Sequence, residues 1–328
     1  MKKIFSLIFI LLIFVSCTSE KEINNENSSI IYEIFPASFN DSNNDGVGDL
    51  NGISLKLDYL KSLGVKNIWL TPINEAFSYH KYDVINYLDV DKILDAINDF
   101  DNLVLKAQEK NIGIIYDLVI NHTSNMHPWF IEAKKAILND ECDKTNKCDY
   151  YNFSHTKENS YEPLGNNFYY EARFYSRMPD LNLDNEDVRK EIEIIIKFWI
   201  DRGVSGFRLD APLHYYAGNV SKNNEFLSWL NQTVKKYKED AYIVREVWSD
   251  EATILSHYES GIESLFNFKD SQSDGKIASS IRSQNDLNLA TYQKEYHDKI
   301  KILIKKLTKV LSYQIMILEE AEVILQMI

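Results

Sequence analysis

Cysteine, glycine-rich motifs and positive charge are all scarce in this chain. Three of its 328 residues are cysteine, which excludes a scaffold built from disulfides. No glycine-rich phosphate loop opens any predicted helix, so a nucleotide cofactor is not indicated. Lys and Arg number 36 against 49 Asp and Glu, and the net charge is −13. An acidic surface repels phosphate backbones, so we expect no nucleic-acid partner.

The first residues have the pattern of a targeting signal. A short positive region precedes an apolar run at 4–15, which is too short to span a bilayer comfortably and ends at a small residue followed by Cys17. This resembles a bacterial lipoprotein signal, so we expect residues 1–17 to be the signal, Cys17 to be lipidated and 18–29 to form a polar tether. The protein would then be extracytoplasmic and membrane-anchored, at the periplasm or cell surface. Ordinary secretion is the alternative.

Predicted strands and helices alternate along the rest of the chain. This rhythm indicates an α/β fold with a parallel sheet, either a barrel or a doubly wound sheet. It breaks at 123–185, a polar and aromatic stretch that we interpret as an inserted irregular subdomain between the barrel segments 30–122 and 186–302. The predicted strands are 30–37, 65–70, 112–120, 206–210 and 241–247, and the predicted helices are 55–63, 96–110, 187–202 and 224–237.

Polar groups follow four of the predicted strands. Asp210 and Glu246 end strands that lie one strand–helix–strand unit apart, so we expect them on neighbouring strand ends facing one pocket. Two carboxyls facing one pocket suit glycoside cleavage, in which one attacks the anomeric carbon and the other gives the leaving group its proton and later takes one back. Arg208 lies two residues before Asp210, on the same side of the strand, and could keep that carboxyl ionised. For any one of these residues alone, a structural salt bridge is the simpler interpretation.

Several motifs together resemble the alpha-amylase family, glycoside hydrolase family thirteen. They are KYDVINYLDVD, DLVINHTS, MPDLNLDN, GFRLDA and REVW, in the family's order. The resemblance implies a (β/α)8 TIM barrel with a subdomain inserted after the third strand, and retaining hydrolysis of α-glucosidic bonds in starch-like α-glucans or maltooligosaccharides. It also implies that Asp210 is the nucleophile and Glu246 the general acid/base. Residues implied to line the subsite of the attacked sugar are Tyr82, Asp83, His122 and Arg208.

Two positions depart from the family pattern, and other functions stay open. Lys81 and Arg245 stand where the family usually has glycine, before Tyr82 and Glu246, and we expect them to narrow the site or alter its charge. Transfer or isomerisation of small α-glucosides is the alternative within the same chemistry. A non-catalytic glycan-binding lipoprotein is the alternative from another class. We expect a monomer.

A run of oxygen-bearing side chains follows the first predicted strand. Alternating Asp and Asn with glycines for a sharp turn is the logic of a Ca²⁺ loop, and this one resembles the calcium loop of oligo-glucosidase-like family members. A solvated turn is the alternative. The predicted ligands are Asp41, Asn43, Asp45 and Asp49, with the carbonyl of Val47.

Cys142 and Cys148 lie six residues apart in a polar loop. In an oxidising compartment they could close a small disulfide, whereas a metal pair is less favoured because no nearby CxxC exists.

The C-terminal stretch 303–328 lacks the family's fourth motif, F-L-x-N-H-D. The motif reappears when the reading frame of the gene is shifted by two bases, so that each new codon joins the third base of one codon to the first two bases of the next. Met316 followed by Ile317 must then encode Asp, and the codons of the neighbouring residues permit the whole motif. We therefore expect a frameshift near 302–307, a barrel incomplete at its C-terminus by two strand–helix units, and impaired activity. A genuine helical tail is the alternative.

Overall fold

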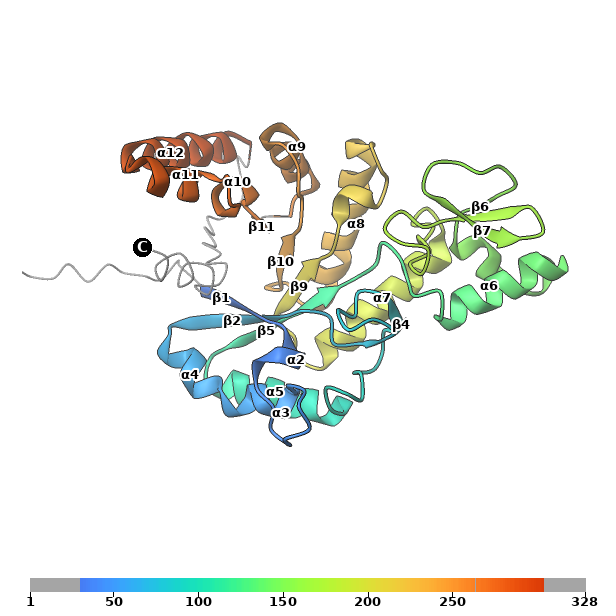
Figure 1. The fold of residues 1–328 in the computed structure, drawn as a ribbon, viewed down its shortest axis with the longest axis horizontal. Coiled ribbons are helices and arrows are strands. Elements are labelled where there is room, and N and C mark those ends of the chain that lie inside the picture. The colour runs from blue at the N-terminus through green and yellow to red at the C-terminus, as the bar shows by residue number, and fades with distance from the viewer. Residues whose placement is uncertain (1–29, 263, 304–328) are drawn as a thin grey trace, which may run out of the picture.

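A six-stranded, fully parallel sheet organises the fold (Figure 1). The computed structural model describes residues 30–262 and 264–303. Each strand pairs in parallel with its neighbour in the order β1-β2-β5-β9-β10-β11, which is the arrangement of an incomplete (β/α)8 barrel. The strands are β1 (Ile30–Ile34), β2 (Val65–Leu70), β5 (Gly113–Leu118), β9 (Gly206–Leu209), β10 (Tyr242–Arg245) and β11 (Ser264–Leu265).

The crossover helices form where apolar residues recur at helical spacing. In α7 (Glu186–Asp201) the Asn185 side chain caps the first turn, and the buried face runs from Val188 to Trp199. The predicted helix at 55–63 instead begins at Leu50 and is divided at Lys56. The other crossover helices are α3 (Leu50–Leu55), α4 (Leu57–Ser62), α5 (Ile97–Glu109), α8 (Val220–Tyr237) and α9 (Glu251–Ser256).

The two faces of the sheet bury different cores. One large apolar core lies between the sheet and its helices, where Tyr116 stacks on Trp199. A second, small cluster of Ile31, Trp69, Ile115, Val244 and Phe266 comes from alternate positions of the strands and occupies the opposite, concave face. Since successive strand residues point to opposite faces, the polar residues of this second face lie on the inside of the partial barrel.

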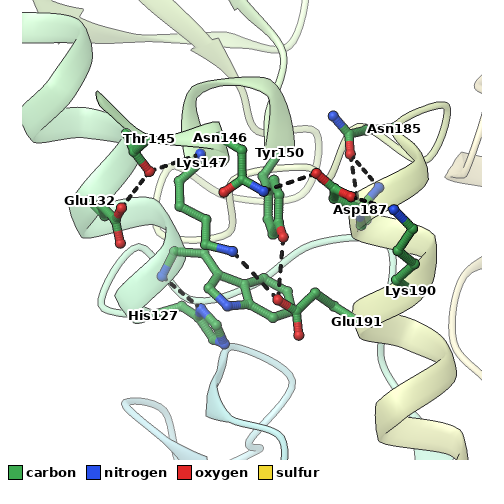
Figure 2. A network of polar contacts seen from close by, with 12 residues as sticks. His127, Glu132, Thr145, Asn146, Lys147, Tyr150, Asn185, Asp187, Lys190 and Glu191 are labelled. Atoms are coloured by element: carbon green, nitrogen blue, oxygen red, sulfur yellow. Dashed lines mark hydrogen bonds and ion pairs between the residues drawn. The ribbon is translucent and has the colours of Figure 1, made fainter. Parts of the chain in front are cut away.

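The inserted stretch is more regular than we expected. It contains α6 (Pro128–Asn139) and an antiparallel sheet of β6 (Phe153–Ser154), β8 (Phe168–Glu171) and β7 (Tyr161–Gly165). Cys142 and Cys148 form the disulfide that their spacing allowed. The residues that they enclose dock on α7: Asn146 bonds Asp187, and Lys147 pairs with Glu191 and lies over the Tyr150 ring (Figure 2).

The remaining described elements are short or lie after β11. They are α2 (Pro36–Phe39), β3 (Glu75–Ala76), β4 (Val84–Asn86), α10 (Phe268–Ser271), α11 (Lys276–Ser283) and α12 (Asp286–Leu303), with 3-10 turns at Cys142–Lys144, Asn146–Tyr150, Pro212–His214 and His257–Ser260. None of the described helices combines the length and apolarity needed to cross a bilayer. The predictions for the signal and tether, for Cys17 and for the tail after 303 fall outside the described residues.

Candidate active site

One buried arginine joins the carboxyl groups of three adjacent strands. The Arg208 side chain projects from β9, and its Nη1 donates to Asp117 Oδ1 (2.9 Å) and to Asp210 Oδ1 (2.7 Å). Its Nη2 donates to the Glu246 carboxylate. Because β9 pairs with β5 on one side and β10 on the other, the three acids converge on a single guanidinium. Arg208 is 3% exposed, so these charge-assisted bonds are shielded from water.

Asp210 and Glu246 lie at the ends of neighbouring strands, as their spacing predicts. Each directly follows its strand, and both bond the Arg208 guanidinium. Burial raises the pKa of Glu246, the negative charge of Asp210 raises it further, and the Arg208 cation opposes the rise. Ala211 follows Asp210 with a φ of 47°, a left-handed conformation that is costly for a residue other than glycine. This turn brings the chain sharply away from the strand directly after Asp210.

Asp117 is a site residue that the sequence analysis did not select. In addition to its bond with Arg208, its Oδ2 accepts from Trp69 Nε1 (3.1 Å) and from the Tyr82 hydroxyl (3.2 Å). Burial raises the pKa of Asp117 to about 7, against the opposing effect of Arg208. Strand alternation could have found it: Tyr116 faces the helices, so Asp117 must face the interior, where a carboxyl in an apolar strand requires a cation. Glu33 on β1 feels the same charges, and burial raises its pKa.

Tyr82 and His122 lie at the same site, and the His122 ring bonds the backbone carbonyl of Tyr82. The Tyr82 ring lies 5.6 Å from the Arg208 guanidinium, and the Tyr82 carbonyl is 3.2 Å from His122 Nε2. Burial lowers the pKa of His122, which favours the neutral imidazole. Asp83 is buried but turns to Ser78, whose backbone N–H and hydroxyl both donate to it. The Asp83 side chain therefore ties together the loop that carries Tyr82 rather than bonding Arg208.

The expectation that Lys81 and Arg245 change the charge of the site is not met. Lys81 has a φ of 62°, which explains a preference for glycine there, and its ammonium pairs with Asp91. Arg245 is fully buried, and its guanidinium bonds the turn at 257–262. Side chains alternate along a strand, so Arg245 points to the opposite side of β10 from Val244, which faces the inside of the partial barrel.

The predicted calcium loop is exposed at 43–46 and buried at Asp49, and its side chains accept hydrogen bonds from its own backbone. Asp41 accepts from the N–H groups of residues 43, 44 and 46, Asn43 accepts from Asp45 N, and Asp45 accepts from Val47 N. Asp49 accepts from Ser42 and caps α3. Within the described residues, no three His, Cys, Asp or Glu side chains gather closely enough to hold one metal ion. The donors are nevertheless all hard oxygens, which suits Ca²⁺.

Acidic side chains lie at the carboxyl ends of adjacent strands in a parallel α/β barrel, which is where enzymes of this fold carry their active sites. Residues 33–317 match the model of the alpha-amylase catalytic domain, and the chain belongs to that family. It is 43% identical over 300 residues to Alpha-amylase 3 of Dictyoglomus thermophilum, covering 89% of this chain and 57% of that protein. It is 38% identical over 226 residues to an oligo-1,6-glucosidase of Heyndrickxia coagulans, covering 64% and 39%.

A solved structure, Amy13B of Eubacterium rectale, superposes with a TM-score of 0.82 at 42% identity, over 84% of this chain and 56% of that one. The chain thus spans roughly half the length of these relatives, or less. Its similarity to them supports the fold and the family directly.

Proposed function

We propose that this site performs retaining hydrolysis of α-glucosidic bonds in starch-like glucans or maltooligosaccharides. The observation that carries the proposal is the pair Asp210 and Glu246 held by the same guanidinium, one on Nη1 and the other on Nη2. Retaining pairs are about 5–5.5 Å apart, whereas inverting pairs leave a gap of about 6.5–9.5 Å for water. Two carboxyls bound to one guanidinium favour the shorter spacing.

The two carboxyls have environments that suit different roles. Arg208 donates to Asp210 Oδ1 at 2.7 Å and orients this carboxylate, which attacks the anomeric carbon to form a glycosyl ester. Burial raises the pKa of Glu246, which favours the protonated form that a general acid needs, and Glu246 gives that proton to the leaving oxygen. Glu246 then takes a proton from water, whose oxygen attacks the glycosyl carbon and releases Asp210.

This assignment predicts the pH dependence of the reaction. Because Glu246 must be protonated in the first step and its pKa is raised, we expect kcat/KM to remain high above the ordinary carboxyl range and to fall as pH rises through the Glu246 pKa. Burial raises the pKa of Asp117 in the same cluster, so the alkaline limb reports the coupled acids together.

The decisive experiment compares Asp210→Asn and Glu246→Gln with the unchanged chain on maltotriose and α-glucosyl fluoride. Asp210→Asn should lose both activities. Glu246→Gln should lose maltotriose cleavage but still release about one equivalent of fluoride per chain, because fluoride leaves without a proton while hydrolysis of the resulting ester needs Glu246 as base. Glu193→Gln, a carboxyl on the outer face of α7, serves as the matched control and should retain both activities. Equal loss in Glu246→Gln and Glu193→Gln would contradict the assignment.

The same assay separates the alternatives. New disaccharides formed from maltose in the presence of an acceptor sugar would indicate transfer, because a hydroxyl of the acceptor then attacks the glycosyl ester in place of water. Sugar binding by both the unchanged chain and Asp210→Asn, without turnover by either, would indicate a non-catalytic glycan-binding protein. A frame-restored chain assayed in parallel tests the predicted impairment, which equal activities would refute.

We also propose a structural Ca²⁺ in the 41–49 loop and a lipid anchor at Cys17. The calcium proposal is supported by the five oxygen donors within nine residues, and the ion would stabilise the connection between β1 and α3. The anchor is supported by the sequence pattern alone. Metabolic labelling with a fatty acid should mark the unchanged chain and not Cys17→Ser, and labelling of both would exclude this anchor.

A further inference from the structure

The residue immediately before Glu246 is a fully buried arginine that takes no part in the pocket. Arg245 ends β10, and its side chain leaves the sheet on the helix-facing side. Its Nη1 donates to the His257 carbonyl (2.5 Å) and to Ser260 Oγ (2.5 Å), and its Nη2 donates to the Ile262 carbonyl (3.0 Å). One side chain therefore ties the end of β10 to both ends of the turn that leads to β11.

The surroundings of Arg245 are neutral, which is unusual for a buried cation. Within the described part of the chain, its hydrogen-bond partners are two carbonyls and a hydroxyl, and the Tyr258 ring lies 5.8 Å away. Burial lowers the pKa of Arg245 to about 9. Burial and the nearby cation lower the pKa of His257 to about 4, so its imidazole is neutral. Burying an arginine without a counter-ion is destabilising relative to an apolar side chain, so its packing alone does not explain it.

The backbone around Arg245 connects this anchor to the active site. The Arg245 carbonyl accepts from Phe266 N (3.2 Å), and Glu246 N donates to the Leu209 carbonyl (3.2 Å). Phe266 in turn packs against Trp69, which bonds Asp117. The peptide that carries Glu246 is thus fixed by β9 on one side, by the β11 segment on the other, and by the guanidinium from behind.

We propose that Arg245 is a positioning residue for the general acid: it fixes the backbone from which the Glu246 carboxyl reaches the leaving-group oxygen. This inference rests on the proposed function. A displacement of about 1 Å at a catalytic group can lower a rate about 100-fold. The loss should fall on the step in which Glu246 donates its proton and should spare a substrate whose leaving group needs none.

The test compares Arg245→Met with Arg245→Lys on maltotriose and on α-glucosyl fluoride. For Arg245→Met we expect kcat/KM for maltotriose to fall tenfold or more, since proton transfer contributes about 10²–10⁴-fold to the rate. We expect kcat/KM for α-glucosyl fluoride to change less than about threefold. Arg245→Lys keeps a donor and should regain part of the loss. The control is Arg189→Met, which also removes an arginine that caps a carbonyl (Leu183 O, 2.8 Å) and lies 5.4 Å from the Trp229 ring. Equal loss on both substrates would overturn the proposal.

Hydrogen exchange provides a measurement that does not require turnover. In Arg245→Met the amides of Glu246 and Phe266 should exchange at least about tenfold faster than in the unchanged chain, because their bonds to neighbouring strands open more often. In Arg189→Met they should keep their protection. Unchanged exchange at both amides in Arg245→Met would overturn the positioning role, whether or not the chain is active. Absence of turnover by both the unchanged and the frame-restored chain would count against the proposed function alone.

Discussion

Replacing Arg208 by methionine should make the stability of the protein strongly dependent on pH. Arg208 is the common partner of three carboxyls, of which Asp117 and Asp210 are buried and Glu246 is partly exposed, and its own side chain is 4% exposed. Removing one partner of a buried ion pair typically lowers stability by about 3–5 kcal/mol. At pH 8 we therefore expect a loss of this size, because the carboxyls must either stay charged without a counter-ion or take up protons.

The sign of the effect follows from the pKa shifts. Asp117 and Glu246 already have raised pKa values, and loss of the cation raises them further. A carboxyl with a raised folded pKa destabilises the fold above its unfolded pKa, and the penalty disappears as pH falls through the unfolded value. The loss in Arg208→Met should thus shrink to about 1–2 kcal/mol near pH 4, leaving the missing hydrogen bonds and packing.

Urea unfolding at pH 4, 6 and 8 measures this directly. A double variant with Asp117→Asn should lose less at pH 8 than Arg208→Met alone, since one uncompensated charge is gone. Arg189→Met, outside the cluster, should show a loss that does not vary with pH. If Arg208→Met lost the same free energy at all three values, the carboxyls would not be coupled through this guanidinium, and the site described above would be wrong.

Three further perturbations test separate parts of the structure. Lys81→Met should lower the free energy of unfolding by about 1–3 kcal/mol because it leaves Asp91 unpaired. Lys81→Gly should lower it by about 1 kcal/mol less, because glycine accepts the positive φ at this position. Equal losses of the two variants in urea unfolding would contradict this. Removing the disulfide with Cys142→Ser and Cys148→Ser should cost about 2 kcal/mol for so short a loop, measured as a lower midpoint, and no change would show that the insert docks without it. Millimolar Ca²⁺ should raise Tm in the unchanged chain but less in Asp45→Asn, and an identical rise in both would exclude the loop.

The strands and long helices could be predicted because their signals are local. The apolar run at Val65–Leu70 is β2 as expected, and α7 begins within one residue of its predicted start because Asn185 caps it. The split between α3 and α4 was missed, since nothing in the local pattern at Lys56 marks a break in the helix. The small sheet of the insert was missed because its strands are short and pair across turns, so hydrophobic periodicity barely registers them.

The site was predicted where it depends on strand ends and missed where it depends on contacts across the sheet. The spacing of Asp210 and Glu246 placed them on neighbouring strands, and β9 and β10 are indeed paired. The role of Asp117 depends on its register with Arg208, its direct partner across β5 and β9, and register between distant strands is not encoded in either segment alone. Ser78 donates to Asp83 and holds it within its own loop, and the predicted place of Asp83 in the sugar subsite stays a prediction.

The alternation of side chains along the strands explains why a cation can stand next to the proposed acid/base without changing the charge of the pocket. Arg208 and Asp210 share the inner face, and Leu209 between them is buried in the outer core. On β10 the inner position is Val244, so Arg245 must point outward, where the turn at 257–262 offers it carbonyls. The charge of the pocket is therefore set by inner-face residues, whereas a substitution at an outer-face position acts on the site through backbone geometry.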